Sequence, residues 1–342
     1  MNIRPRLAVS MGDPAGIGPE ICLRLLANAS VAKICTPIVF GNASLLERVA
    51  IHCDLPMPEA VIRMADGIKA VSEVGQPAVF DCTSDDAATI HPGTVDATTG
   101  AQSFEYVTRS IDAALEGCVA GVVTAPINKE AWQAAGIEYP GHTELFAERA
   151  GTDEFCMMMT APAFSCSLVT THVGYAEVPQ LLTAERILEV IRLTHTALER
   201  NLGRPPKLVA LGLNPHAGEH GLFGDREEEK VIEPAVELAI KEGIDIEGPI
   251  PPDTGFIEWR RQQTDGYICM YHDQGLIPFK ALNFDTGVNT TLGLPIIRTS
   301  VDHGTALDIA WQGKAEVSSL IAAVELAAKL STNSECGGRN SE

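Results

Sequence analysis

The 342-residue sequence has few aromatic residues, no excess of basic residues and no apolar run long enough to cross a membrane. Phe, Trp and Tyr make up 5% of the chain, so its core must be built mainly from Val, Ile, Leu, Ala and Met. The formal net charge of −20 argues against nucleic acid or an anionic membrane as partner, because both require a cationic surface. A small anionic ligand is not excluded, since one Lys and one Arg in a cleft outweigh the average field locally.

The nine cysteines form no C-x-x-C pair, and most of them lie within apolar runs. An odd count without a disulfide framework predicts reduced, buried thiols in a cytoplasmic protein. The apolar stretch before Asp13 is too short for a secretory signal.

Familiar nucleotide and metal motifs are also missing. The turn from Gly12 to Gly18 has neither the G-x-G-x-x-G spacing of a Rossmann fold nor the lysine of a P-loop. The H-E-x-x-H pattern of zinc proteases is absent as well. Any dinucleotide is therefore expected to bind without the Rossmann fingerprint.

The chain is too long for one comfortable core, so two domains are expected. Short apolar runs typical of strands alternate with segments of helical periodicity, which predicts an α/β fold. Asp225 and Glu228 have the spacing of a capping box and predict a helix that ends at Gly243. The loop before that helix contains several glycines and fits either a ligand-binding loop or an ordinary surface connection.

Three histidines follow predicted buried strands: His172, His216 and His272. In open α/β sheets the carboxyl ends of the strands form the ligand-binding edge, and three imidazoles with one open position make a catalytic metal site. The alternative is that each histidine only bonds a nearby carbonyl. His142 and His303 have similar settings, so spacing alone does not select the three ligands.

Polar residues near the C-terminal part of the chain suit a phosphate or carboxylate. Lys280 and Arg298 flank a segment that contains Asn289, and together they offer a point charge, a planar fork and an amide. His142 and Thr143 lie at a predicted helix start, where backbone N–H groups favour anions. The alternative interpretation is that the charged side chains are merely solvated and Thr143 is a helix cap.

Five segments of the chain form a set of long motifs: MGDPAGIGPE from Met11, GHTE from Gly141, NPHAGE from Asn214, YHDQG from Tyr271 and RTSVDHGTA from Arg298. Together they resemble the 4-hydroxythreonine-4-phosphate dehydrogenase family of vitamin B6 biosynthesis. The similarity runs from about Leu7 to Leu330 and follows the order of motifs in that family.

The resemblance implies a two-domain α/β/α fold similar to isocitrate and isopropylmalate dehydrogenases, and not a Rossmann fold. Residues 1–125 and 283–342 would form a discontinuous first domain on the cofactor side. Residues 126–282 would form the second domain, with the metal ligands and the dimer interface. Members of the family are cytoplasmic homodimers in which one subunit completes the metal site of the other.

The resemblance also assigns site residues. It selects His172, His216 and His272 as ligands of one divalent ion (zinc, magnesium or cobalt) in each active site. Its substrate contacts correspond to His142, Thr143, Lys280, Asn289 and Arg298. Asp253 and His142 are the candidates for proton transfer. Asp302 and Asp308 are placed near NAD, or possibly NADP, by analogy with the fold.

The implied reaction is oxidation and decarboxylation of 4-phosphohydroxy-L-threonine to 3-amino-2-oxopropyl phosphate, in pyridoxine 5′-phosphate biosynthesis. Some segments, such as TAPINK from Thr124, also resemble paralogues that oxidise D-threonate 4-phosphate or D-erythronate 4-phosphate. A metal-dependent hydrolase or aldolase using the same histidines is the alternative from a different class.

Overall fold

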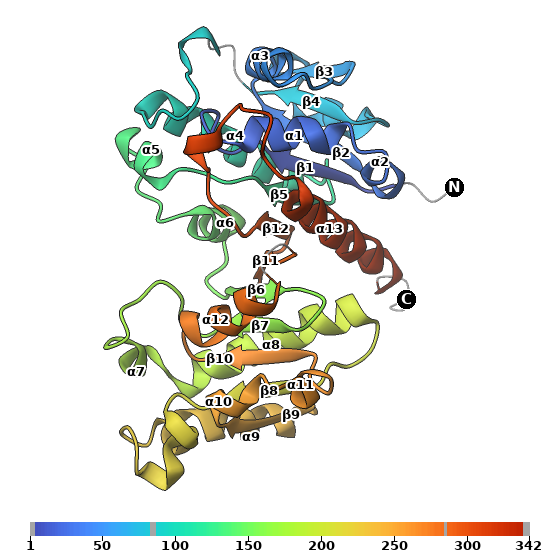
Figure 1. The fold of residues 1–342 in the computed structure, drawn as a ribbon. Coiled ribbons are helices and arrows are strands. Elements are labelled where there is room, and N and C mark those ends of the chain that lie inside the picture. The colour runs from blue at the N-terminus through green and yellow to red at the C-terminus, as the bar shows by residue number, and fades with distance from the viewer. Residues whose placement is uncertain (1–3, 83–86, 284–285, 338–342) are drawn as a thin grey trace. The chain divides into compact units, whose positions relative to one another are not determined.

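The structure is a computed structural model that describes residues 4–82, 87–283 and 286–337 (Figure 1). It divides into a first unit, Met1–Asp153 with Leu294–Glu342, and a second unit, Glu154–Gly293. These boundaries lie later in the chain than the expected ones near 125 and 283.

Residues 126–153 fall in the first unit because α5 (Lys129–Ala134) packs against α4 (Ala97–Leu115). Trp132 of α5 is fully buried, and its indole Nε1 donates a hydrogen bond to Ser103 Oγ of α4 at 2.8 Å. The edge of Trp132 also contacts the Phe104 ring.

The first unit contains six parallel strands in the order β3-β4-β2-β1-β5-β12. Their bounds are β1 (Arg6–Ser10), β2 (Thr36–Gly41), β3 (Ala60–Arg63), β4 (Ala78–Asp81), β5 (Gly121–Thr124) and β12 (Ile297–Val301). This is not the 3-2-1-4-5-6 order of a dinucleotide-binding Rossmann sheet. The strands β1, β2 and β5 are almost wholly buried, which is typical of parallel sheets covered by helices.

The remaining helices of the first unit are α1 (Gly18–Leu26), α2 (Val31–Ile34), α3 (Ala43–Cys53), α6 (His142–Ala150) and α13 (Ser318–Gly337). α4 packs on β1 and β2, and α13 packs on β12 and β5. Pro19 lies in the first turn of α1, where the N–H that proline lacks has no intrahelical partner.

The strands of the second unit follow the order β11-β6-β7-β10-β8-β9. The strands are β6 (Cys156–Thr160), β7 (Ser165–Leu168), β8 (Leu208–Leu211), β9 (Ile246–Ile250), β10 (Gly266–Cys269) and β11 (Val288–Leu292). β7, β10, β8 and β9 are parallel, whereas β6 is antiparallel to both β11 and β7.

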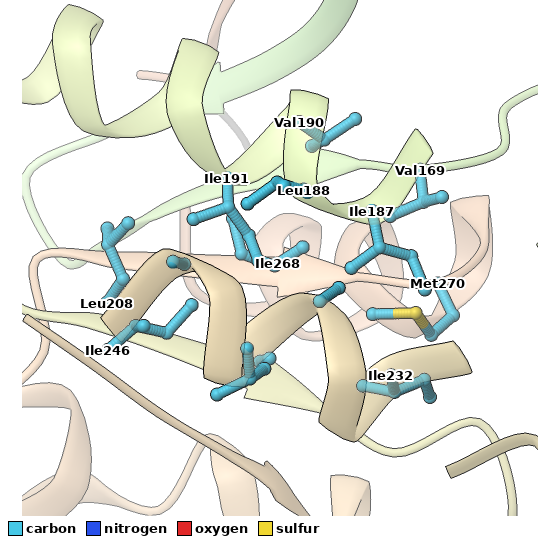
Figure 2. Packing of buried hydrophobic residues seen from close by; sticks show 14 of the residues in the cluster. Val169, Ile187, Leu188, Val190, Ile191, Leu208, Ile232, Ile246, Ile268 and Met270 are labelled. Atoms are coloured by element: carbon cyan, nitrogen blue, oxygen red, sulfur yellow. The ribbon is translucent and has the colours of Figure 1, made fainter. Parts of the chain in front are cut away.

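Alternation along these strands builds a core on each face of the sheet in the second unit. Ile268 packs with α8 (Ala184–Leu202) and α9 (Glu233–Lys241), and Figure 2 shows Ile187, Leu188 and Ile191 in the same cluster. The neighbouring residue Tyr267 belongs to the opposite cluster, with Phe279 of α12 (His272–Asn283). Helices on both faces give three layers. The shorter helices are α7 (Val178–Leu181), α10 (Pro252–Gly255) and α11 (Glu258–Arg261).

Two local predictions can be compared with this structure. The eight cysteines whose side chains the structure describes are all free thiols, as expected. The predicted capping box at Asp225 and Glu228 is wrong: Asp225 pairs with Lys230, and Glu228 turns inward to accept hydrogen bonds from Asn214.

Among the described residues, none of the helices has the length and apolar character needed to cross a membrane.

Candidate active site

Three adjacent parallel strands of the second unit end close to the three histidines selected above. His172 lies four residues after the end of β7, His272 begins α12 three residues after the end of β10, and His216 lies five residues after the end of β8. The order β7-β10-β8 makes these strands direct neighbours. The carboxyl edge of this sheet therefore carries all three side chains.

Two of these imidazoles lie side by side. The ring centroids of His172 and His272 are 5.6 Å apart, with an angle of 41° between the ring planes. Two imidazoles that bind one ion through nitrogens at about 2.1 Å in a tetrahedral arrangement have their ring centres roughly 5 Å apart. The spacing of this pair therefore fits shared coordination of a divalent ion.

Carboxylates accompany two of the three histidines. His272 Nδ1 is 2.7 Å from Asp273 Oδ1, and the Tyr175 hydroxyl donates to the other oxygen of Asp273. These two hydrogen bonds lower the pKa of Asp273, which keeps the carboxylate ionised. A carboxylate on Nδ1 favours the imidazole tautomer whose Nε2 lone pair is available to a metal. His216 Nδ1 has a longer contact of 3.3 Å with Glu219.

His216 lies in an unusual backbone conformation. Six consecutive residues, 216–221, have positive φ angles between 45° and 86°. The side chain of His216 is 62% exposed, and its ring contacts Phe223 edge-on. Left-handed backbone in non-glycine residues is costly and persists where the surrounding structure fixes it.

Within residues 4–82, 87–283 and 286–337, no group of three or more His, Cys, Asp or Glu side chains is placed to hold a metal ion. The single chain therefore presents a two-imidazole arrangement, with His216 on a separate exposed loop. Catalytic zinc sites use three protein ligands, so the pair of His172 and His272 would need one further ligand.

The first unit contains a buried cation. Arg298, on β12, is only 2% exposed, its Nη2 donates to Thr124 Oγ1 at 2.9 Å, and its guanidinium lies over the Phe146 ring. Burial lowers the pKa of Arg298 to about 10, while the nearby Glu144 acts in the opposite direction. The side chain is therefore charged at neutral pH and shielded from water, which strengthens its attraction for an anion.

His142, the first residue of α6, lies in the field of the same arginine. Burial, together with the charges of Arg298 and Lys129, holds the pKa of His142 well below its usual value. Its Nε2 is enclosed and has no hydrogen-bond partner in the described part of the chain. A neutral imidazole with an unsatisfied ring nitrogen is suited to accept or donate a hydrogen bond to a ligand.

The other predicted site residues are divided between the two units. The first unit carries half-buried Thr143 on α6, half-buried Asp302 after β12 and exposed Asp308. Gly141, not Thr143, is the N-cap of α6. The second unit carries exposed Asp253 on α10, exposed Lys280 on α12 and half-buried Asn289 on β11. The Oδ1 of Asn289 is enclosed and lacks a hydrogen-bond partner among the described residues.

Sequence reasoning missed several residues that support this site. Asp273 directly follows His272, and Glu219 follows His216 by three positions. This spacing could have identified both carboxylates as partners of the histidines. Thr124 is 174 residues from Arg298, and no local pattern links the two.

Comparisons with known proteins agree with the motifs. Residues 33–327 match the family described as pyridoxal phosphate biosynthetic protein PdxA. The chain is 44% identical over 333 residues to 4-hydroxythreonine-4-phosphate dehydrogenase of Desulforapulum autotrophicum, covering 96% of both chains. It is 43% identical to a putative D-threonate 4-phosphate dehydrogenase of Oceanobacillus iheyensis, covering 96% of this chain and 99% of the relative.

A solved structure supports the same relationship. The crystal structure of 4-hydroxythreonine-4-phosphate dehydrogenase from Klebsiella pneumoniae matches with a TM-score of 0.83 and 40% identity, covering 96% of this chain and 99% of that one. The expected α/β fold is thereby confirmed. Both the sequence and the structural match extend over nearly the whole chain, so the chain belongs to the PdxA family of pyridoxal phosphate biosynthetic proteins.

Proposed function

We propose that this chain is an NAD-linked, divalent-metal-dependent dehydrogenase that oxidises and decarboxylates 4-phosphohydroxy-L-threonine to 3-amino-2-oxopropyl phosphate. The observation that carries the proposal is the imidazole pair of His172 and His272, with Asp273 on the second ring. Relatives with dehydrogenase names support oxidoreductase chemistry over the hydrolase or aldolase alternative.

The proposed metal ligands are His172, His216 and His272. A divalent ion held there would lower the pKa of the substrate hydroxyl and stabilise developing negative charge, an effect typically worth several kcal/mol. Asp273 would orient the His272 ring, and Glu219 would do the same for His216.

Arg298, Lys280 and Asn289 are the proposed phosphate contacts, with Thr143 and His142 completing the substrate set. Arg298 supports this role because it is charged, buried and held by Thr124. NAD, when bound, would accept the hydride from the substrate carbon, and the hydroxyl proton would pass to a base on the protein. His142 and Asp253 are the candidates to receive it. The lowered pKa of His142 keeps that imidazole neutral with a lone pair available, and it also makes His142 a weaker base than an ordinary histidine.

Several further parts of the proposal depend on the family alone. Asp302 and Asp308 are proposed neighbours of NAD or NADP. The working form is proposed to be a cytoplasmic homodimer in which a second copy completes each metal site.

D-Threonate 4-phosphate is the second candidate substrate, because relatives 43% and 40% identical to this chain carry that substrate in their names. It has a hydroxyl at C2 where the B6 precursor has an amine. The proposed metal and phosphate ligands suit both compounds equally.

The test is a side-by-side measurement of NADH formation by metal-loaded protein with each of the two phosphorylated acids. We expect a higher kcat/KM for 4-phosphohydroxy-L-threonine. A preference for D-threonate 4-phosphate would establish the second candidate instead. Absence of NADH with either compound, or full activity after removal of metal by a chelator, would contradict the proposed function.

A further inference from the structure

The side chain of Gln274 connects two of the strand ends that carry the histidines. Gln274 lies in the first turn of α12 and is 6% exposed. Its Oε1 accepts a hydrogen bond from the backbone N–H of Met270 at 2.7 Å, and its Nε2 donates to the carbonyl of Gly212 at 2.7 Å. Met270 directly follows β10, and Gly212 directly follows β8.

A threonine extends this connection to the third strand. Thr170, two residues beyond β7, donates from Oγ1 to the carbonyl of Met270 at 2.7 Å. The backbone N–H of Thr170 bonds the same carbonyl at 3.2 Å. The peptide groups on both sides of Met270 are thus held by buried side chains, Thr170 after β7 and Gln274 in α12.

Each bonded position lies a short distance before a histidine. His172 and His272 each follow their bonded residue by two positions, and His216 follows Gly212 by four. Beyond the ends of β7 and β10, backbone bonds from Val169 N and Thr170 N still join the two segments, and the Thr170 hydroxyl adds to them. The pairing of β10 with β8 ends at Ile268 and Ala210, and the link between the segments that follow is made by the side chain of Gln274.

Helix capping alone does not account for Gln274. A side chain in the first turn of a helix often accepts a hydrogen bond from a backbone N–H just before the helix, and this explains the bond from Met270. The second bond joins Gln274 to a carbonyl 62 residues away in sequence. A buried amide that uses both of its ends on separate segments fixes the distance between those segments.

We propose that Gln274 is a positioning residue that sets the spacing of the histidine-bearing strand ends and thereby the affinity for a divalent ion. The proposal rests on the metal-dependent function proposed above. Gln274 is proposed to act through the backbone, without contacting substrate or metal. Its replacement is therefore expected to weaken zinc binding more than a comparable loss of a buried hydrogen bond elsewhere in the unit does.

The test compares wild type with Gln274→Met, which keeps the length of the side chain and removes both hydrogen bonds. Zinc is titrated calorimetrically into chelator-stripped full-length protein, and NADH formation is measured against metal concentration. We expect about tenfold or greater loss of zinc affinity, within the range typical of residues that support metal ligands. We also expect kcat to recover largely at saturating metal.

Thr194→Val is the matched control, because it removes a buried hydrogen bond between Thr194 and Ser167 in the same unit, within the α8 core. It is expected to lower the melting temperature of the stripped protein without changing zinc affinity. If Gln274→Met does not fold, Gln274→Glu replaces it, because the carboxylate keeps the acceptor for Met270 but loses the donor for Gly212.

The outcomes separate the two proposals. Wild-type protein that binds no zinc would overturn the metal-dependent function and the positioning role together. Wild type that binds zinc, with equal affinity in the Gln274 variant, would overturn the positioning role alone. Equal losses of affinity in the Gln274 and Thr194 variants would also overturn it, because general destabilisation would then explain both.

Discussion

Asp13 is a carboxyl group with no exposed surface, in the glycine-rich turn that follows β1. One of its oxygens accepts a hydrogen bond from Ala15 N at 2.8 Å, and Oδ2 has no partner among the residues described. Burial raises the pKa of Asp13 to about 6, against the effect of the Ala15 bond and with a further contribution from Asp96. The folded chain therefore keeps a proton that the unfolded chain releases near pH 3.8.

This shift has a defined sign for stability. Between pH 4 and pH 6 the folded state binds more protons, so the free energy of unfolding falls as pH rises. Asp13→Asn removes that dependence. We expect its stability relative to wild type to increase by up to about 3 kcal/mol from pH 4 to pH 7, since two pKa units correspond to about that energy. Urea unfolding at several pH values measures it. Asp54→Asn, at an exposed position in the same unit, is the control, and parallel curves for both variants and wild type would contradict the prediction.

Arg298 permits a second prediction at the scale of one residue. Arg298→Lys keeps the charge, but a single ammonium does not reproduce the planar fork that contacts Thr124 and is proposed to bind the substrate phosphate as well. We expect KM for the phosphorylated substrate to rise by about tenfold to a hundredfold, because a hydrogen bond to a charged group contributes about 1.5–3 kcal/mol. Steady-state kinetics measure KM and kcat. The same change at exposed Arg192, which pairs with Glu242, should leave both constants unchanged.

Arg298 was predictable from sequence more readily than its environment. It was selected because it and Lys280 flank a segment that contains Asn289, and because it matches a substrate contact of the family. Its burial and its bond to Thr124 depend on the pairing of β12 with β5, which no local pattern specifies. The buried state of Asp13 likewise arises from contacts such as that of Asp13 N with the Pro126 carbonyl, far away in the chain.

At the scale of elements, the loop between β8 and α9 depends on a buried acid. Glu228, 1% exposed, accepts hydrogen bonds from the backbone and side chain of Asn214 at 2.8 and 3.1 Å. Gly218 lies directly over this carboxylate: a Cβ on Gly218 would be 2.5 Å from Glu228 Oε2. The left-handed loop that carries His216 is therefore fixed against Glu228.

Gly218→Ala tests whether this contact matters for the site. The methyl group must displace the Glu228 carboxylate and with it the Asn214 contacts, so we expect catalytic activity to fall by at least about tenfold while the fold persists. Activity and melting temperature are both measured. Gly203→Ala is the control, because Gly203 also has a positive φ, 71°, but open space where the methyl would lie. Equal activities of the two variants would show that the strained loop does not position His216.

This loop also shows why one element was predicted wrongly. The spacing of Asp225 and Glu228 matches a capping box, but Asn214, at the start of the loop, binds the Glu228 carboxylate instead. The conformation of the loop could not be predicted, because Ala217, Glu219 and His220 adopt positive φ without the usual glycine signal. In contrast, β7, β8 and β10 are wholly buried strands, as predicted, and each is followed by one of the three histidines.

At the scale of the whole molecule, periodicity predicted the α/β class but not the division of the chain. The segment 126–153 was expected in the second domain. Its assignment to the first unit rests on contacts of α5 with α4, such as the bond from Trp132 to Ser103, which connect positions 29 residues apart. The net charge of −20 gave no sign of the buried Arg298, because composition averages over positions.

The proposed metal site requires more ligands than the described part of one chain brings together. Two imidazoles lie together, yet no three suitable ligands meet within the described part of one chain, whereas catalytic zinc sites use three. If a second copy provides the missing ligand, inactive variants should complement each other. A mixed dimer of His216→Ala and His272→Ala subunits would contain one site with all three histidines intact and one site lacking two of them.

Equal amounts of the two variants, exchanged to a random mixture, should therefore recover roughly a quarter of wild-type activity, because half of the dimers are mixed and each has one of two sites intact. Native mass spectrometry verifies the exchange, and NADH formation measures recovery. Each variant alone is the control and should be inactive. Mixed dimers that form and stay inactive would show that all three ligands come from a single chain, and that the His216 loop must then move toward the His172 and His272 pair to complete the site.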